Sequence, residues 1–239
     1  TTDSKGAYSI KLEKTNKVNV TIQNEKYITF QDWVVVPDKQ NYRDFILDAA
    51  HPLGINTDEF QIPTEYSYEI RQGISETKLQ FIGTIDSIVV DESMRITGKQ
   101  YNPEGKLVPV QSIKIGLSGF ETDELGYWNM YEVPTDLQLK LSAKESFLID
   151  LAYYFYADPK YTYERKQDAV IIGKTSCVHF MVTEKATKKI YDIYLIQDGP
   201  EEGLVKRIVQ NDQADQEYAM ITFTAYYVEE TIEPPVIIE

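Results

Sequence analysis

The segment from residue 94 to residue 147 constrains the fold of this chain more than any other. It holds four runs of strand-forming residues with turn-forming residues between them. We expect turns at Asn102-Pro-Glu-Gly105, at Gly116–Gly119 and at Thr122-Asp-Glu-Leu-Gly126, because Gly, Pro, Asn and Asp favour the backbone conformations that tight turns need. This order of short strands and turns predicts a small all-β sandwich module.

The sequence on both sides of this module also has strand character. Residues 7–36 read as three strands, residues 66–92 continue the pattern, and further strands are expected at residues 169–172, 177–183, 189–197 and 219–228. We therefore predict a mainly β protein. A β-sandwich or β-barrel domain with one flanking helix would be built from residues 1–92 and 148–239, and a small Ig-like or transthyretin-like β-sandwich module would occupy residues 93–147. Whether the two flanking regions form one domain or two is left open.

The strongest helix pattern lies at residues 39–50, where Tyr42, Phe45, Ile46 and Ala49 form one apolar stripe. A short helix is also expected over residues 200–210. Residues Phe147–Tyr156 fit either a helix, since Ser142 and Glu145 have the spacing of a capping box, or a buried strand.

The chain is acidic, with a net charge of −14, and its charge is unevenly distributed. Residues 198–239 carry ten acidic and two basic side chains, whereas residues 159–190 carry seven basic and three acidic ones. Phosphate groups require neutralising cations, so this balance argues against direct, sequence-specific nucleic-acid binding. A solvated acidic surface is the favoured interpretation. The alternative is an assembly whose acidic face repels DNA or pairs with the basic segment of a neighbour.

The residue types that catalytic sites need are sparse. The two histidines lie far apart, the familiar hydrolase, phosphate-binding and zinc-protease motifs are absent, and Cys177, the one cysteine, reads as a small buried residue. We expect no enzyme, no catalytic residues and no cofactor. Calcium is the ion that the acidic turns at Asp123-Glu124 and Asp198–Glu202 would suit, although ordinary polar turns explain them better. No apolar run is long enough for membrane insertion.

Two regions are candidates for an interaction surface. The first is an aromatic group, for which a half-buried hairpin, a subunit interface and a sugar platform all remain open: Tyr153, Tyr154, Tyr156, Tyr161 and Tyr163. The second is the C-terminal region, with Tyr226 in a terminal strand and, after Pro234-Pro235, the apolar residues Val236, Ile237 and Ile238. This tail would be held either by its own sheet or, as an arm, by another subunit.

Residues 94–147 resemble the carboxypeptidase-regulatory-like, transthyretin-like β-sandwich family. The similarity rests on a series of short motifs, with a last strand at Leu137–Ala143: Ile96-Thr-Gly98, Asn102–Lys106, Val108-Pro109-Val110, Thr122–Trp128 and Val133-Pro134. The resemblance implies a non-catalytic spacer or binding unit and transfers no functional residue.

The whole chain is similar in style to bacteriophage virion proteins of the tail-tube and baseplate type. The features in common are a β pattern with one helix, an inserted sandwich module, strong acidity and an N-terminus without a secretory-signal pattern. This implies a self-assembling structural virion protein, made in the host cytoplasm, whose partners are further copies of itself and other virion proteins. The alternative is a secreted or cell-surface β module that binds carbohydrate or protein through Tyr153–Tyr163.

Overall fold

A computed structural model describes residues 17–24, 27–35, 45, 47–55, 61–228 and 231–237. The described chain is mainly β, with two antiparallel sheets and one helix. Contacts divide it into two units, residues 1–57 and residues 58–239. This division differs from the predicted boundaries at residues 92/93 and 147/148, because the first strand of the predicted module pairs over Ser93–Gln100 with the strand before it.

The first unit contains a two-stranded hairpin, β1 (Lys17–Asn24) and β2 (Tyr27–Val35), as the alternating sequence predicts. Residue Ala49 forms an isolated β-bridge with Tyr27, and the amide of Ile28 donates to the carbonyl of Asp48 over 2.8 Å. The predicted helix at residues 39–50 is wrong in its described part, residues 45 and 47–50, because that backbone bonds to β2 instead of to itself. The rest of the predicted helix, and the strand expected before residue 17, lie outside the described residues.

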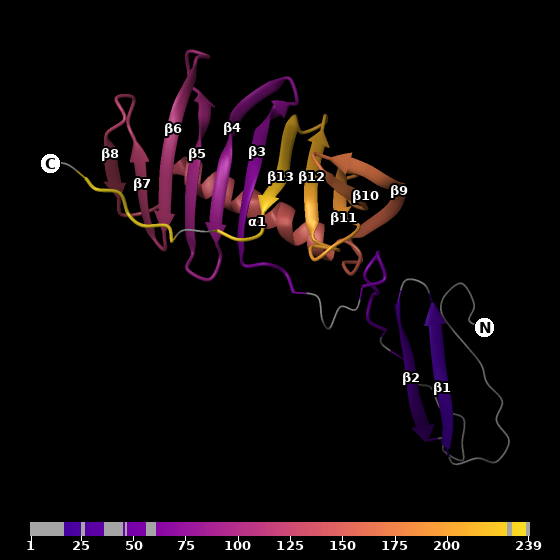
Figure 1. The fold of residues 1–239 in the computed structure, drawn as a ribbon. Coiled ribbons are helices and arrows are strands. Elements are labelled where there is room, and N and C mark those ends of the chain that lie inside the picture. The colour runs from indigo at the N-terminus through magenta and orange to yellow at the C-terminus, as the bar shows by residue number, and fades with distance from the viewer. Residues whose placement is uncertain are drawn as a thin grey trace. The chain divides into compact units, whose positions relative to one another are not determined.

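The second unit is built on one eleven-stranded sheet. Figure 1 shows its strands side by side, from β8 at one edge to β9 at the other. Its first six strands form a meander: β3 (Glu65–Ser75), β4 (Lys78–Ile88), β5 (Ser93–Tyr101), β6 (Leu107–Ile115), β7 (Ser118–Thr122) and β8 (Trp128–Tyr131). The last five form a second meander: β9 (Tyr161–Ile172), β10 (Thr175–Glu184), β11 (Ile190–Ile196), β12 (Val205–Asp212) and β13 (Glu217–Ala225). The order is β8-β7-β6-β5-β4-β3-β13-β12-β11-β10-β9, so the two meanders join at the β3–β13 pair in the middle.

The turns that connect β5 to β8 largely follow the sequence. Gly105 and Gly126 end turns with positive φ angles of 75° and 87°, and each amide bonds back three residues, to Asn102 and Asp123. The turn at Gly116 is tighter than expected, because Gly119 already belongs to β7. The short helix expected over residues 200–210 is wrong, since β12 begins at Val205. This strand pairs with β11 and β13, and its side chains alternate between buried and half-buried positions.

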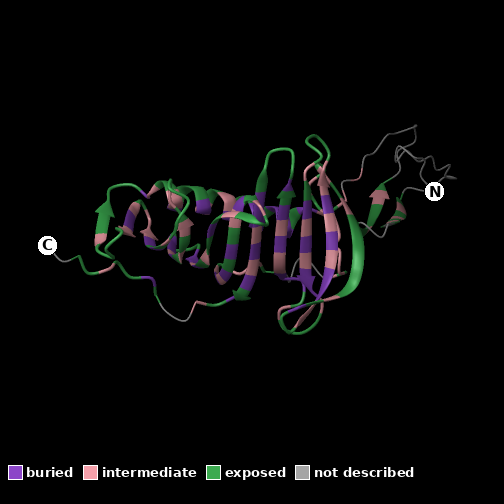
Figure 2. Ribbon diagram, turned by 90° about the horizontal axis from the view of Figure 1, so that it is seen from above, coloured by how far each residue is buried: buried purple, intermediate pink, exposed green. Residues whose placement is uncertain are grey.

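Side chains alternate between the two faces of the central strands, and Figure 2 shows this as bands of buried and exposed residues. The inner face is apolar and packs against the helix. The largest fully buried side chains of the unit include Tyr68, Tyr191, Phe155, Phe180, Phe223 and Ile70.

Two paired glycines shape the inner face of β4 and β5. Gly83 lies opposite Gly98, and the ring of Phe81 covers both. A Cβ atom at Gly83 would lie 2.7 Å from Cζ of that ring and 2.6 Å from the carbonyl oxygen of Thr97. Only glycine permits this approach, and the aromatic ring restores the packing that the glycines lack.

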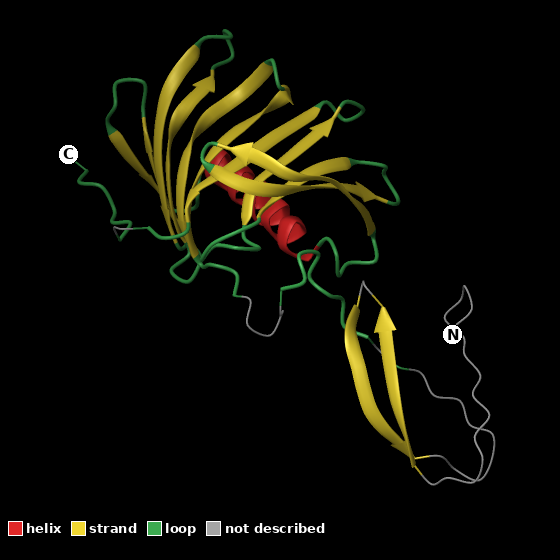
Figure 3. Ribbon diagram, turned by 45° about the vertical axis from the view of Figure 1, so that its right-hand side comes forward, coloured by secondary structure: helices red, strands yellow, loops and turns green. Residues whose placement is uncertain are grey.

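The helix α1 (Asp136–Tyr154) connects the two meanders and runs across one face of the curved sheet (Figure 3). It begins with a capping box in which the Thr135 hydroxyl accepts from the Gln138 amide and the Gln138 side chain accepts from the Thr135 amide. The predicted strand at Leu137–Ala143 is therefore wrong: the apolar alternation there yields to a capped helix, and Phe147–Tyr154 continues that helix.

Gln138 fastens the start of α1 to the sheet. Its amide nitrogen donates to the Ser112 hydroxyl, to the Ile113 carbonyl at 2.9 Å and to the Phe120 carbonyl at 3.2 Å. A Cβ atom at Gly119 would lie 2.6 Å from Gln138 Oε1, so glycine is required for this contact. Both polar atoms of the fully buried Gln138 side chain thus have hydrogen-bond partners.

The chain after β13 packs on the outer face of the sheet. Ile232 is buried in a cluster with Ile88, Ile113 and Phe120. The C-terminal tail is therefore held at Ile232 by the sheet of its own chain.

Candidate functional site

A buried carboxyl group, Glu145, lies in the middle of the inner face of α1. Its side chain is only 3% exposed. It faces Tyr66 and Tyr68 on β3 and Ser87 on β4, and the charge of Lys114 on β6 acts on it. Glu145 follows Gln138 and Leu141 on the buried stripe of the helix, which is why helix periodicity points an acidic side chain into the core.

The environment of Glu145 keeps its proton near neutral pH. Burial raises the pKa of Glu145 to about 7, although the hydroxyls of Tyr68, Tyr66 and Ser87 and the charge of Lys114 lower it in part. Glu145 Oε1 and the Tyr68 hydroxyl both lack a hydrogen bond of normal geometry. Burial also raises the pKa of Tyr68 well above its usual value, so this hydroxyl remains a donor.

A cavity of about 180 Å³ opens beside Glu145, between α1 and the ends of β4 to β6. Its walls carry hydroxyl groups, one ammonium group and two carboxyl groups among apolar side chains: Tyr66, Ser87, Ile88, Val89, Glu92, Ser93, Met94, Lys114, Ser142, Glu145 and Ser146. A space of this size holds a few water molecules, which would satisfy the open oxygen of Glu145. The arrangement can exchange a proton at neutral pH, but the cavity lining places no cysteine or histidine beside the carboxyl group.

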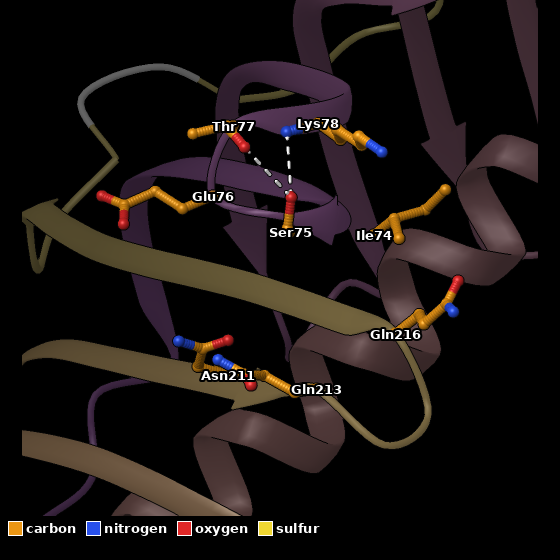
Figure 4. A pocket seen from close by; sticks show the side chains of 8 residues that line it. All are labelled: Ile74, Ser75, Glu76, Thr77, Lys78, Asn211, Gln213 and Gln216. Atoms are coloured by element: carbon orange, nitrogen blue, oxygen red, sulfur yellow. Dashed lines mark hydrogen bonds between the residues drawn. The ribbon is translucent and has the colours of Figure 1, made fainter.

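A second concave site lies between two hairpin turns (Figure 4), and its volume is about 410 Å³. The β3–β4 turn supplies residues 74–78, and the β12–β13 turn supplies Asn211, Gln213 and Gln216. The Ser75 hydroxyl accepts from the Lys78 amide at 3.2 Å and bonds to the Thr77 hydroxyl at 3.3 Å. This site offers hydroxyl and amide groups together with the charged side chains of Glu76 and Lys78, and no arrangement for covalent chemistry.

The two histidines belong to different units of the chain. His179 Nε2 lies 2.7 Å from Asp192 Oδ1, and its ring stacks on Tyr194. His51 belongs to the first unit, where burial lowers its pKa to about 4. Cys177 is buried, and burial raises the pKa of its thiol, which confirms the expected small core residue.

The acidic turn at Asp123 has a structural task. Asp123 Oδ1 accepts from the amides of Leu125 and Tyr127, both at 2.9 Å, so this carboxylate closes the β7–β8 turn. Within the residues that the structure describes, no group of three His, Cys, Asp or Glu side chains is placed to hold a metal ion.

The predicted aromatic group around residues 153–163 is partly core. Tyr153 is buried, and the rings of Tyr156 and Tyr163 pack edge-on against Phe155. Tyr154 is exposed, while Tyr156, Tyr161 and Tyr163 are half-buried. The structure thus offers Tyr154, and the outer edges of its neighbours, as surface.

The predicted C-terminal contacts are also divided. Tyr226 is buried, and its hydroxyl donates to the Val205 carbonyl, so it belongs to the core of its own unit. The strand that precedes Tyr226, β13, is paired with β3 and with β12, so it offers no open edge. Val236 is 84% exposed and Ile237 is exposed, whereas Ile238 lies outside the described residues.

A surface that the sequence did not indicate lies along β8 and its flanking turns. Six large apolar side chains between residues 117 and 133 are exposed: Leu117, Leu125, Tyr127, Met130, Tyr131 and Val133. We call residues 117–133 the β8 end of the sheet. The sequence predicts only that these residues belong to a small β-sandwich module, and the strand order shows that β8 lies at the end of the sheet.

The comparisons give no relative for this chain: no protein-family model matches it, and no curated protein matches it. The described part of the chain also contains no helix with the length and apolar character needed to cross a bilayer.

Proposed function

We propose that this protein is a self-assembling structural subunit. A bacteriophage particle, in its tail or baseplate, is the setting that the sequence resemblance favours, with further copies of the chain and other virion proteins as partners. The observation that carries the proposal is the β8 end, an open sheet edge surrounded by exposed apolar side chains.

Such an edge is costly for a protein that works alone. Its free N–H and C=O groups and its apolar side chains together form a template for pairing with another chain. Leu125 is 81% exposed and Leu117 is 79% exposed, values at which apolar side chains near an open edge indicate an interaction site.

The hairpin of the first unit supports the same proposal. A two-stranded hairpin is only marginally stable in water by itself. The structure leaves Trp33, Val35 and Ile28 of β2 exposed. These side chains would gain burial in an assembly.

Light scattering over a concentration series, with electron microscopy of each species, tests the proposal. We expect defined oligomers, rings or tubes. The Met130→Glu variant should shift the distribution toward monomer, because it places a charge on the β8 end. The Val90→Lys variant, which changes an exposed apolar side chain in the β4–β5 turn, is the matched control and should assemble normally. A monomer at every concentration, alone and with its cognate virion proteins, would rule the proposal out.

A carbohydrate- or protein-binding module is the second candidate, and exposed Tyr154 is the feature that favours it. It predicts that replacing Tyr154 and Tyr156 by Ala abolishes binding to a glycan array while the fold remains. Assembly is the better-supported function, because Tyr153, Tyr156 and Tyr163 contribute to the packing of their own unit.

A further inference from the structure

Among the residues that the structure describes, the eleven-stranded sheet has two open edges, β8 and β9, which lie at its opposite ends (Figure 1). Every other strand of this sheet has a neighbour on both sides. The two edge strands point the same way, because ten antiparallel steps separate them in the strand order. A second sheet could therefore continue the first at either end without reversing the face that carries α1.

The two ends of the sheet carry opposite charge. Residues 118–136, which run from β7 to the start of α1, contain five acidic side chains and no basic one. Residues 159–190, which form β9, β10 and the turns around them, contain seven basic and three acidic side chains. In a chain with a net charge of −14, this basic end is an exception that requires an explanation.

The basic surplus lies in the turns that flank β9. On the strand itself two acidic and two basic side chains pair locally, with Arg165 bonded to Asp168 and Lys166 bonded to Glu164, each at 2.6 Å. Of the other five basic side chains, Lys160, Lys174, Lys185 and Lys188 are exposed at the ends of the β9–β10 hairpin. The fifth, Lys189, is half-buried and pairs with Asp212, Asp215 and Glu217.

We propose that the β8 edge of one copy pairs with the β9 edge of a second copy, so that the sheet continues from subunit to subunit. This inference rests on the proposed function and names its interface. When the faces of the two copies are aligned, the strands pair in parallel. The acidic turn before β8, with Asp123 and Glu124, then lies beside the basic turns at the start of β9, with Lys185 and Lys188.

Charge selects this pairing over the two symmetric ones. A β8–β8 contact would bring two acidic ends together, and a β9–β9 contact would bring two basic ends together. The contact between unlike edges is heterologous, so repeated copies close into a ring or extend into a helical filament. Because β8 has only four residues, the strand ladder is short, and the exposed apolar side chains around it must supply much of the contact.

Cross-linking between two differently substituted chains tests the contact directly. Both chains carry Cys177→Ala, one also carries Asn129→Cys on β8, and the other also carries Lys166→Cys on β9. After mixing, a short thiol-specific cross-linker should join the two kinds of chain at least about fivefold more efficiently than it joins Asn129→Cys chains to Val90→Cys chains, because pairing raises the local thiol concentration.

The outcomes separate this inference from the proposed function. Oligomers that show no preferential β8–β9 cross-link, or that cross-link Asn129→Cys chains mainly to one another, overturn the head-to-tail contact and leave self-assembly intact. A chain that stays monomeric overturns both.

A charge exchange provides the second measurement. Glu124→Lys alone, or Lys188→Glu alone, should weaken association by about fivefold to tenfold, because each places like charges across the contact. The chain that carries both substitutions should recover most of the loss. If the double variant associates as weakly as the two losses combined predict, the two turns do not meet and the proposed orientation is wrong.

Discussion

Gln138 and Glu145 lie two turns apart on the same face of α1, and they differ in how completely the sheet satisfies their hydrogen bonds. Gln138 is fully buried and bonds to Thr135, Ser112, Ile113 and Phe120. Glu145 is almost as deeply buried, but one of its oxygen atoms has no hydrogen bond and its pKa is raised to about 7. A buried polar group stabilises a fold only when its partners are complete. The polar contacts of Gln138 thus stabilise the start of the helix, whereas the buried carboxyl group of Glu145 in its middle lowers the stability of the fold.

The largest effect is expected at Gln138. Gln138→Ala would leave the Thr135 amide and the Phe120 carbonyl without this partner and would open a small cavity. We expect a loss of about 3 to 4 kcal/mol in the free energy of unfolding, measured by urea denaturation. Lys140→Ala, at an exposed position of the same helix, is the control and should change stability little. A loss as small as that of the control would show that Gln138 does not anchor the helix.

Glu145 should show the opposite sign and a pH dependence. Its folded-state pKa lies above the ordinary value of 4.5, so the folded protein holds the proton over a range in which the unfolded chain releases it. Stability should therefore fall as the pH rises from about 4.5 to about 7, by about 3 kcal/mol in total, since one pKa unit corresponds to about 1.4 kcal/mol.

Glu145→Gln should remove this fall. At pH 8 we expect the variant to be more stable than the natural protein by about 2 to 3 kcal/mol, with little difference at pH 4.5. Denaturation curves at a series of pH values measure the effect, and Glu132→Gln, an exposed acidic position, is the control. A destabilised variant at pH 8 would mean that the ionised carboxylate has favourable partners.

Gly119→Ala tests the contact between β7 and the capping box. The added methyl group would lie 2.6 Å from Gln138 Oε1 and 3.0 Å from Pro134 Cα, so we expect a loss of about 2 kcal/mol from overpacking. A double-mutant cycle with Gln138→Ala checks the cause. The cost of the alanine should shrink when Gln138 is absent, and strictly additive losses would place the clash elsewhere.

The smallest effect is expected for Tyr68→Phe. The Tyr68 hydroxyl has no hydrogen bond of normal geometry, so its removal should change stability by less than about 1 kcal/mol. Because this hydroxyl lowers the pKa of Glu145, the variant should raise that pKa and move the pH-dependent loss of stability upward. NMR titration of the Glu145 carboxyl carbon measures the shift, and a lowered pKa would contradict the assigned role of Tyr68.

Much of the local structure could be predicted from the sequence. The hairpin of β1 and β2, the glycine turns between β5 and β8, and the buried Cys177 all follow from side-chain alternation and turn chemistry. These features depend on neighbours within a few residues, so the order of residues is enough to define them. The mainly β class with one helix is confirmed, but the helix lies at Asp136–Tyr154, where the sequence predicted a strand over Leu137–Ala143.

Less of the candidate site around Glu145 could be predicted from the sequence. The sequence predicts Glu145 only as part of a possible capping box with Ser142. The apolar alternation of Leu137–Ala143 favours a strand at the position where the capping box of Thr135 and Gln138 begins the helix. Helix periodicity from Thr135 would have placed Glu145 on the inner stripe. The sequence does not indicate, however, that Tyr66, Tyr68 and Ser87 face Glu145, because those residues lie 58 or more positions earlier in the chain.

Most of the strands and the glycine turns follow from the sequence, because side-chain alternation and turn chemistry involve residues close together in the chain. Which strands become edges depends on long-range pairing, since the β3–β13 pair joins segments about 150 residues apart and leaves β8 and β9 with one neighbour each. As a result of this long-range pairing, β13 and Tyr226 are buried and the β8 end is exposed. It also places Glu145 of α1 against Tyr66 and Tyr68 of β3. Strand order depends on the packing of whole faces, which no single stretch of sequence specifies.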